Sequence, residues 1–380
     1  MSIAIVTGSL TPYTARAYEA FAERCRETLH VYTCAKIEPH RAWSIPPPRH
    51  FVHTVLGGMR WHRDDASHLY VNPAVLTHLV RLRPETLAVA AFSPTMLAAV
   101  GYARLTRTPY GVATDGTLDT DPGEQSRPHR MMRQAMIPGA AFGICASEAS
   151  QALLERWGLA RGTGVVVPIV SAWDAPATQP GFHERPFDVI IAGGINDKYK
   201  GVLFFAEVVE RLAMRGRRLK VRVTGKGPLR EELAQRLAAA GIEAQFDGVL
   251  QPEAMAGAMS SARILMFPSR QDPWGLVANE AVLCGTPVLG SPHATSSPHL
   301  VERFGVGLVR PLKVEAWCDA VLDMLSGEAR WRSFMAGRPA AVDWFSVDAA
   351  VAGLKRAFDL GRDANRPAMR GSTVRGAPQG

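Results

Sequence analysis

Short apolar runs alternate with helical patterns over most of the chain. In the first half, β-branched runs such as 3–8, 28–34 and 86–92 precede segments whose apolar residues recur at the spacing of a helix. Strands and helices that alternate in this way are typical of a parallel, doubly wound sheet. We therefore predict an α/β domain of this kind in the first half.

The apolar periodicity is lost in a proline-containing stretch, 173–186, and then resumes. Beyond it, runs such as 187–194, 219–227 and 263–269 again alternate with helical segments, which predicts a second doubly wound domain. Two such domains are expected to face a cleft at the carboxyl ends of both sheets. The predicted organisation is a domain over 1–172, a linker over 173–186, a domain over 187–340, a C-terminal helix over 341–360 and a disordered basic tail over 361–380.

Composition places the chain among globular proteins of the cytoplasm. Its 380 residues are 47% hydrophobic and 21% charged. No apolar run approaches the roughly 18 to 20 residues of a bilayer span, and the N-terminus shows no secretory signal. The five cysteines are widely spaced and form no CxxC pair, so we interpret them as small buried hydrophobic residues rather than as ligands or disulfides.

The net charge of +8 invites nucleic acid, an anionic membrane or a phosphorylated ligand as partner. No stretch resembles a nucleic-acid-binding arm, so nucleic acid is not expected. Arg127, Arg130 and Arg133 lie about one helical turn apart among methionines, which suits either a basic amphipathic helix on the inner face of the cell membrane or an ordinary solvated helix. Both interpretations stay open.

Two glycine-rich turns in the second half have features of phosphate sites. Gly225 and Gly227 follow a β-rich run, and Pro228 stands where the next helix would begin. Glycines let the backbone approach a ligand, and a helix N-terminus offers N–H groups to an anion. The stretch 193–201 has the same order: Gly193 and Gly194, a polar loop with Lys198 and Lys200, and then a helix. A lysine in such a loop is a point charge suited to a diphosphate.

A third segment of the second half contains two carboxylates close to the predicted start of a helix. Asp272 precedes the predicted helix and Glu280 lies about one turn inside it, with Trp274 and Gly275 between them. Carboxylates accept hydrogen bonds from vicinal hydroxyls, which sugars and riboses offer in pairs. The helix N-terminus between the two acids would point at the intervening phosphates.

The order and spacing of these three segments resemble the retaining glycosyltransferases of the GT-B fold, family 4, also called glycosyl transferases group 1. The resemblance rests on "GGINDKYKG", "GKGPLREEL" and "PSRQDPWGLVANEAVLCGTPV". It covers roughly 187 to 310 well and the first half only in outline. It implies a GT-B architecture with the donor bound by the C-terminal domain and the acceptor on the side of the N-terminal domain. We also expect the C-terminal helix to cross back to the N-terminal domain.

The resemblance also implies roles for single residues. Lys200 would bind the donor diphosphate, Glu280 the ribose hydroxyls and Asp272 the hydroxyls of the donor sugar. Two positions depart from the family: Asp272 stands for a longer glutamate, and Gly194 stands for an arginine whose charge Lys198 would have to replace. The remaining expected donor contacts are backbone groups of the loops: Gly193, Gly225, Gly227, Trp274, Gly275, Leu276 and Val277.

The implied activity is transfer of a hexose from a nucleotide-diphosphate sugar, with retention of configuration and with no cofactor or obligatory metal. The acceptor would be a glycan, a lipid-linked sugar or a small molecule, in the synthesis of cell-surface polysaccharide or glycolipid. The departing phosphate would itself take the acceptor's proton, so that no strong protein base is needed. Lys200 and the helix-terminal N–H groups would stabilise its growing charge.

The first half adds weaker candidates at the ends of its predicted strands. Asp115 follows the run 109–114 and is placed to touch sugar or acceptor, and Gly8 ends the first run in a loop that opens toward the same cleft. Asp119 and Asp121 form a DxD pair, which in the other major glycosyltransferase fold holds a metal over a diphosphate. Against a metal here, the donor motifs lie in the other half of the chain.

Other functions are also compatible with parts of this sequence pattern. A nucleotide-sugar epimerase or a sugar phosphorylase would share the two-domain cleft. A non-catalytic donor-binding protein would fit the departures at Gly194 and Asp272.

Overall fold

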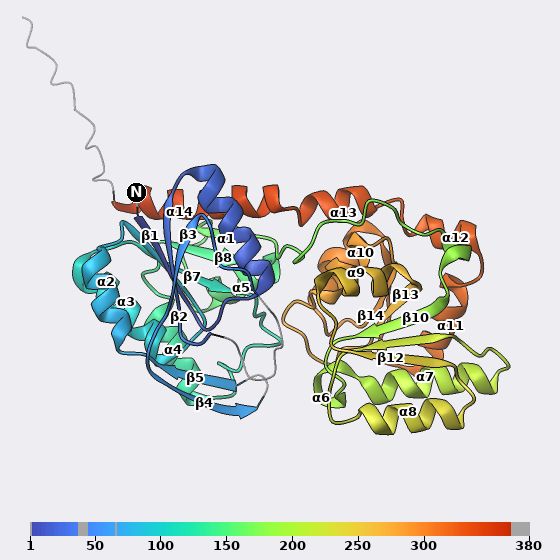
Figure 1. The fold of residues 1–380 in the computed structure, drawn as a ribbon. Coiled ribbons are helices and arrows are strands. Elements are labelled where there is room, and N and C mark those ends of the chain that lie inside the picture. Colours follow the sequence, from blue (N-terminus) through green and yellow to red (C-terminus); the bar gives the residue numbers. More distant parts are fainter. Residues whose placement is uncertain (1, 37–44, 65–66, 366–380) are drawn as a thin grey trace, which may run out of the picture.

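The computed structural model describes residues 2–36, 45–64 and 67–365, with the side chains of 62–68 and 365 left aside. Its fold consists of two Rossmann-like α/β domains side by side, each built on a parallel sheet (Figure 1). The first sheet has seven strands in the order β3-β2-β1-β6-β7-β8-β9, and the second has six in the order β12-β11-β10-β13-β14-β15. In both sheets the order reverses beside the first strand, as in doubly wound folds.

The N-terminal domain alternates strands with helices as its sequence predicts. Its strands are β1 (Ser2–Thr7), β2 (Thr28–Thr33), β3 (Phe51–Val55), β6 (Thr86–Ala90), β7 (Tyr110–Thr114), β8 (Phe142–Cys145) and β9 (Gly164–Val166). Its helices are α1 (Pro12–Cys25), α2 (Ala74–Leu82), α3 (Pro94–Thr106), α4 (Arg127–Met136) and α5 (Glu148–Arg156). An antiparallel hairpin, β4 (Met59–Asp64) with β5 (Ser67–Val71), was not predicted.

The C-terminal domain repeats the pattern. Its strands are β10 (Phe187–Ala192), β11 (Val221–Thr224), β12 (Ala244–Gly248), β13 (Ala262–Phe267), β14 (Val288–Gly290) and β15 (Gly307–Val309). Its helices are α6 (Asp197–Lys200), α7 (Val202–Met214), α8 (Arg230–Ala239), α9 (Pro252–Ser260), α10 (Val277–Leu283), α11 (Val314–Met324), α12 (Glu328–Ser333) and α13 (Arg338–Trp344). Two short helical segments, η1 (Phe182–Glu184) and η2 (Ser297–Glu302), and a long last helix, α14 (Val347–Asn365), complete the chain.

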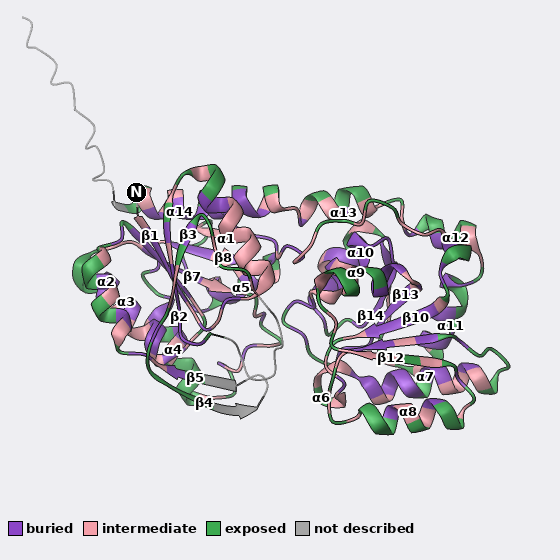
Figure 2. Cartoon of the chain, in the orientation of Figure 1, coloured by how far each residue is buried: buried purple, intermediate pink, exposed green. Residues whose placement is uncertain are grey.

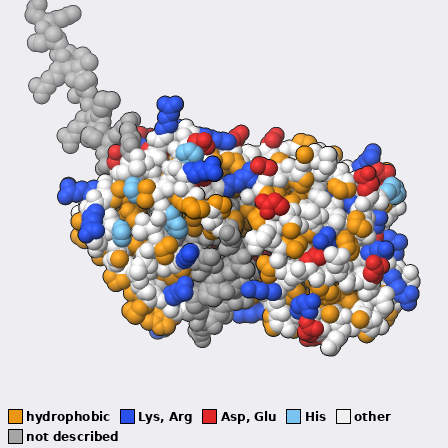
Figure 3. All heavy atoms as spheres, in the orientation of Figure 1, with side chains coloured by type: hydrophobic (Ala, Val, Ile, Leu, Met, Phe, Trp, Pro, Cys, Tyr) orange, Lys and Arg blue, Asp and Glu red, His pale blue; other side chains and the backbone are white. Residues whose placement is uncertain are grey.

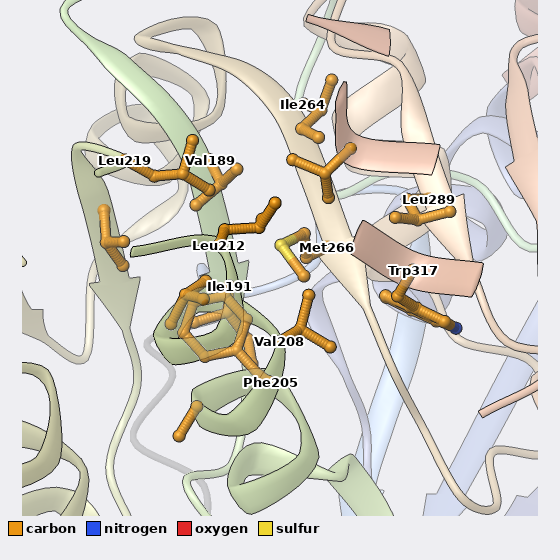
Figure 4. Packing of buried hydrophobic residues seen from close by; sticks show 14 of the residues in the cluster. Val189, Ile191, Phe205, Val208, Leu212, Leu219, Ile264, Met266, Leu289 and Trp317 are labelled. Atoms are coloured by element: carbon orange, nitrogen blue, oxygen red, sulfur yellow. The ribbon is translucent and has the colours of Figure 1, made fainter. Parts of the chain in front are cut away.

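Both sheets are covered by helices on both faces. Their strands therefore read as nearly continuous apolar runs rather than as alternating ones, and they are mostly buried (Figure 2). In the C-terminal domain, Phe205 of α7 and Trp317 of α11 pack on Val189, Ile191 and Met266 of the sheet (Figure 4). This packing fixes the strand ends that carry the polar loops of the candidate site.

The last helix returns to the N-terminal domain. α14 packs against α1, β8 and β9. Phe358 lies 5.5 Å from Phe21 and 5.6 Å from Phe142, measured between ring centroids. The expected crossing is therefore confirmed. The helix runs from Val347 to Asn365, so residues 361–365 of the predicted tail are helical, and the rest of that tail lies outside the described residues.

The charged surface does not form a single basic patch on the face shown in Figure 3. Lys and Arg side chains are spread over both domains and interleaved with Asp and Glu. Arg362, which the sequence assigned to the tail, pairs with Glu27 of the N-terminal domain at 2.5 Å. Within the described part of the chain, no helix combines the length and the apolar character that crossing a bilayer requires.

Candidate functional site

Two glycine-rich turns of the C-terminal domain lie directly on one another. Gly193, at the end of β10, donates its N–H to Thr224 O at 3.0 Å, and Ile195 donates to Lys226 O at 2.9 Å. A side-chain carbon at Gly225 would come within 1.7 Å of Gly193 O, and one at Gly227 within 2.2 Å of Ile195 O. Both glycines are thus required by the contact between the turns. Their predicted contact with the donor stays a prediction.

A one-turn helix places Lys200 beside these turns. Asn196 caps α6 by accepting the N–H of Tyr199 at 3.0 Å. Gly201 then ends the turn with φ +64°, and a side-chain carbon there would meet Pro268 O at 2.1 Å. Arg270 N–H, in the loop after β13, donates to Tyr199 O at 2.8 Å. These backbone contacts hold the end of α6 against the loop that carries Asp272.

Lys200 and Asp272 meet, although 72 positions separate them in the sequence. The ammonium donates to Asp272 Oδ2 at 2.5 Å, and the side chains are 31% and 11% exposed. Lys200 also lines a small pocket, together with Gly193, Gly194 and Ser269. The ammonium has three N–H donors, and Asp272 takes one of them. The arrangement suits an anion in the pocket and a polar group at the carboxylate.

The loop between Asp272 and α10 is fixed by its backbone and by aromatic packing. Trp274 is buried, and its ring lies 5.8 Å from that of Trp344. Only the backbone of Trp274 is therefore available to a ligand, and the backbone contacts with the donor predicted for Trp274, Gly275, Leu276 and Val277 stay predictions. Gly275 has φ +91°, and a side-chain carbon there would meet Phe267 at 2.5 Å. Ser296 donates its N–H to Trp274 O at 2.8 Å and its hydroxyl to Gly275 O at 3.2 Å.

Glu280 lies in the first turn of α10, as predicted. Burial raises the pKa of its carboxyl from the ordinary 4.5 to about 8. In the part of the chain that the structure describes, no hydrogen bond or ion pair satisfies this carboxyl. A buried carboxyl with unused acceptor capacity can accept hydrogen bonds from a ligand's hydroxyl groups.

Lys198 is placed differently from Lys200. Its side chain is exposed, and its ammonium lies 4.7 Å from the centre of the Tyr199 ring. No described contact brings Lys198 to Asp272. The position therefore offers a second cation near the turn, but not one held in the same way as Lys200.

Asp115 and Gly8 lie in the other domain. Asp115 is exposed and directly follows β7, and Gly8 directly follows β1. A side-chain carbon at Gly8 would meet the ring of Tyr70 at 3.1 Å, so close packing accounts for this glycine. Neither residue lines the pocket beside Lys200. Their predicted contacts with sugar or acceptor remain predictions.

The structure argues against the DxD pair as a metal site. Asp121 is buried and accepts hydrogen bonds from Arg133 Nε at 2.8 Å and from Trp157 Nε1 at 3.0 Å. Its carboxylate is thereby neutralised and occupied, and Asp119 alone makes no site. No group of three or more acidic, histidine or cysteine side chains suited to a metal occurs among the described residues.

The ion pair between Arg133 and Asp121 also bears on whether α4 could lie on a membrane. Arg133 is buried, and its guanidinium lies 4.2 Å from the centre of the Phe92 ring. Arg130 donates to the backbone of the preceding loop, at Gly123 O and Glu124 O. One of the three arginines therefore faces the core, which weakens the basic face expected for membrane contact.

Sequence reasoning missed the residues that support the site. Asn279, next to Glu280, is buried: it accepts from Trp274 Nε1 at 3.0 Å and donates to Ile169 O at 2.8 Å. Ser269 lines the pocket with a buried hydroxyl that has no hydrogen-bond partner among the described residues. One supporting residue did carry a local signal in the sequence. Asn196 directly precedes α6, and asparagine is a residue type that commonly caps a helix.

Comparison with known proteins finds similarity over the segment that carries these residues. Residues 186–327 match the model of the family described as glycosyl transferases group 1. This segment of the chain is similar to the group 1 glycosyltransferases. The matched residues include both glycine turns, Lys200, Asp272 and Glu280, so the resemblance stated from the sequence is confirmed.

Individual relatives match over part of their length. An alpha-D-kanosaminyltransferase of Streptomyces kanamyceticus is 28% identical over 188 residues, which is 47% of this chain and 48% of the relative. A GDP-mannose-dependent alpha-(1-6)-phosphatidylinositol dimannoside mannosyltransferase of Mycobacterium tuberculosis is 31% identical over 121 residues, 32% of this chain and 31% of the relative. The chain thus aligns with about a third to a half of these relatives.

Solved structures share the fold over nearly the whole chain. Anabaena Alr3699/HepE in complex with UDP and glucose has a TM-score of 0.71 at 15% identity, covering 94% of this chain and 99% of that one. WaaG, a glycosyltransferase involved in lipopolysaccharide biosynthesis, has a TM-score of 0.66 at 15% identity, covering 94% and 99%. The fold is GT-B, as the sequence implied.

Proposed function

We propose that the protein transfers a sugar from a nucleotide-diphosphate sugar to a saccharide or lipid-linked acceptor. The observation that carries this proposal is the contact of Asp272 with Lys200, which lines the pocket beside Gly193. A cation and a carboxylate held side by side can bind a phosphate and a sugar hydroxyl of one molecule at once. The group 1 family match over the same residues supports it.

Glu280 completes the donor site in this proposal by accepting hydrogen bonds from the ribose hydroxyls. The sugar would lie toward Asp272, and the diphosphate between the Lys200 ammonium and the backbone at Gly275 and Leu276. As the bond from sugar to phosphate breaks, the leaving diphosphate gains charge, which a preorganised cation stabilises without reorganisation. The same phosphate then takes the acceptor's proton, and the sugar is transferred with retention of configuration.

The finer parts of the proposal are the absence of a required metal or cofactor, a hexose as the sugar, and a role in cell-surface polysaccharide or glycolipid synthesis. Asp115, at the end of β7, is the proposed contact with sugar or acceptor from the N-terminal domain. A lipid-linked acceptor would bring the protein from the cytoplasm to the inner face of the membrane.

A thermal-shift screen against UDP-, GDP- and ADP-sugars tests the donor assignment. A donor at a concentration well above its dissociation constant raises the melting temperature by mass action. At 100 times Kd the added free energy of unfolding is about 2.7 kcal/mol. The protein is then incubated with the stabilising donor, in EDTA to remove divalent metals, with and without a mixture of saccharide acceptors. Transfer that depends on acceptor supports the proposal. A sugar epimerised without acceptor, or no stabilisation by any donor, would contradict it.

A further inference from the structure

One carboxylate of the N-terminal domain reaches across to the C-terminal domain. Glu148 is the first residue of α5, after Ser147, whose hydroxyl caps that helix. Its Oε1 accepts from Arg303 Nη1 at 3.0 Å, and its Oε2 lies 3.3 Å from His299 Nδ1. Burial acts to raise the pKa of Glu148, but a hydrogen bond from the backbone at the start of α5, the Arg303 guanidinium and the neighbouring His299 together lower it below its ordinary value. One acid thus faces two basic side chains of the other domain.

The segment that carries these basic side chains is bonded to the loop of the candidate donor site. η2 begins directly after Ser296, whose N–H and hydroxyl donate to Trp274 O and Gly275 O. Just before it, Thr295 N–H donates to Asp272 O at 3.3 Å. A displacement of η2 therefore acts directly on the backbone of residues 272–275, which we term the donor loop.

Arg303 has a second connection to the same loop. Its guanidinium lies 5.6 Å from the centre of the Trp344 ring, and Trp344 lies against Trp274 of the donor loop. Trp344 ends α13, immediately before α14 crosses to the N-terminal domain. Arg303 is thus in contact with the opposite domain on one side and with the aromatic support of the donor loop on the other.

We propose that Glu148, His299 and Arg303 form an interdomain clasp that sets the position of the donor loop relative to the N-terminal domain. The proposal rests on the proposed function, because a two-domain transferase must bring a donor on one domain against an acceptor on the other. A misplacement of about 1 Å at the reacting atoms can cost roughly 100-fold in rate. None of the three residues lines the pocket, so they are positioning residues.

The clasp is a weak contact, as is needed if the two domains are to open and close during turnover. The side chains of Glu148 and Arg303 are 50% and 45% exposed, and that of His299 is 25% exposed. Exposed pairs of this kind are individually weak and are screened by salt. A weak contact can bias domain closure without trapping the product, whose release often limits turnover.

The test compares Glu148→Gln with a matched control, Glu124→Gln. Glu124 pairs with Arg156 at 2.9 Å and is 51% exposed, but both partners lie in the N-terminal domain. We expect Glu148→Gln to lower kcat for the donor found in the screen by about 3- to 10-fold. Its Kd for the matching nucleoside diphosphate should stay within about twofold of wild type, because the C-terminal domain holds that ligand. The control should match wild type in both.

A charge exchange and a solution measurement separate positioning from a structural effect. The double variant Glu148→Arg with Arg303→Glu should recover much of the kcat that each single change loses. Small-angle scattering should show a larger radius of gyration for Glu148→Gln than for the control. Identical kcat and scattering in the two variants would overturn the clasp. If UDP, GDP and ADP all fail to bind wild type, the proposed function fails, and the scattering comparison still decides whether the clasp exists.

Discussion

At the scale of single residues, the pair of Lys200 and Asp272 is the centre of the site. A point charge at a diphosphate makes hydrogen bonds worth about 1.5 to 3 kcal/mol each. We expect Lys200→Ala to weaken nucleoside diphosphate binding by about 10- to 100-fold. Turnover should fall by about 100-fold or more, because the charge that grows on the leaving group loses its cation. Calorimetric titration and initial-rate kinetics measure the two effects.

The neighbouring lysine provides the control for that experiment. Lys198 belongs to the same short helix, but its ammonium lies over the Tyr199 ring rather than beside Asp272. Lys198→Ala removes the same formal charge and should weaken binding by no more than about threefold, the size of a screened surface interaction. Equal losses in the two variants would mean that general charge, and not the position of Lys200, binds the phosphates.

The buried carboxyl of Glu280 makes donor binding depend on pH. Its pKa of about 8 leaves it mostly protonated near neutral pH in the free protein. Ribose hydroxyls donate hydrogen bonds to the ionised form, so affinity should rise as pH increases from about 6 toward 8.5, by up to about tenfold per pH unit below the pKa. The Glu280→Gln variant should bind more weakly and lack this part of the pH dependence. The ligand's own phosphate titration is common to both proteins and cancels in the comparison.

The same pKa shift predicts the opposite trend for stability. The folded state holds the Glu280 proton up to a pH of about 8, whereas the unfolded chain releases it near pH 4.5. Between these values the folded state binds more protons, so its stability falls as pH rises. Glu280→Gln should therefore gain melting temperature relative to wild type on going from pH 5 to pH 9. A constant difference between the two proteins over this range would show that the carboxyl titrates normally.

At the scale of elements, the site depends on two turns that touch through glycine. Gly225→Ala would place a carbon 1.7 Å from Gly193 O, which forces one turn away from the other. We expect a loss of stability on the order of 3 kcal/mol and weaker donor binding, because Gly193 borders the pocket beside Lys200. Chemical denaturation and calorimetric titration measure the two quantities.

Gly216 provides a control for Gly225→Ala, because alanine there costs only the strain of a positive φ angle. It has φ +83° and open space where a side-chain carbon would be, so Gly216→Ala introduces strain without a clash. Its cost should be about 1 to 2 kcal/mol, with donor binding unchanged. If Gly225→Ala costs no more than Gly216→Ala, the contact between the two turns does not control the geometry of the site.

The elements themselves were largely predictable, and their long-range partners were not. Alternating apolar runs predicted both sheets, and the three glycine- or acid-containing segments placed Lys200, Asp272 and Glu280 in the loops and the helix start that follow strands. The local spacing of Asp119 and Asp121 left a metal site open only as an alternative, and it gave no sign that Arg133 and Trp157, further along the chain, both donate to Asp121. Asn279 was missed for the same reason, since its partner Ile169 lies 110 positions away.

At the scale of the whole molecule, the two domains are joined by more than the clasp. The chain crosses from the first domain to the second before β10 and returns in α14. α14 buries Ala350, Leu354 and Phe358 in the core that also contains Phe21 and Phe142. The N-terminal domain therefore lacks part of its own core until the last helix has been added, which makes its folding depend on the far end of the chain.

Phe358→Ala tests this dependence. Removing a fully buried phenylalanine costs about 3 to 5 kcal/mol through lost burial and the remaining cavity. The effect should be local: amide hydrogen exchange should accelerate in α1 and β8, although both lie more than 200 residues earlier in the sequence. Phe205→Ala, an equally buried change in the core of the second domain, should instead accelerate exchange in β10 and α11. Exchange that rises in the C-terminal domain for both variants would show that α14 belongs energetically to the domain that precedes it, and that the N-terminal core is complete without it.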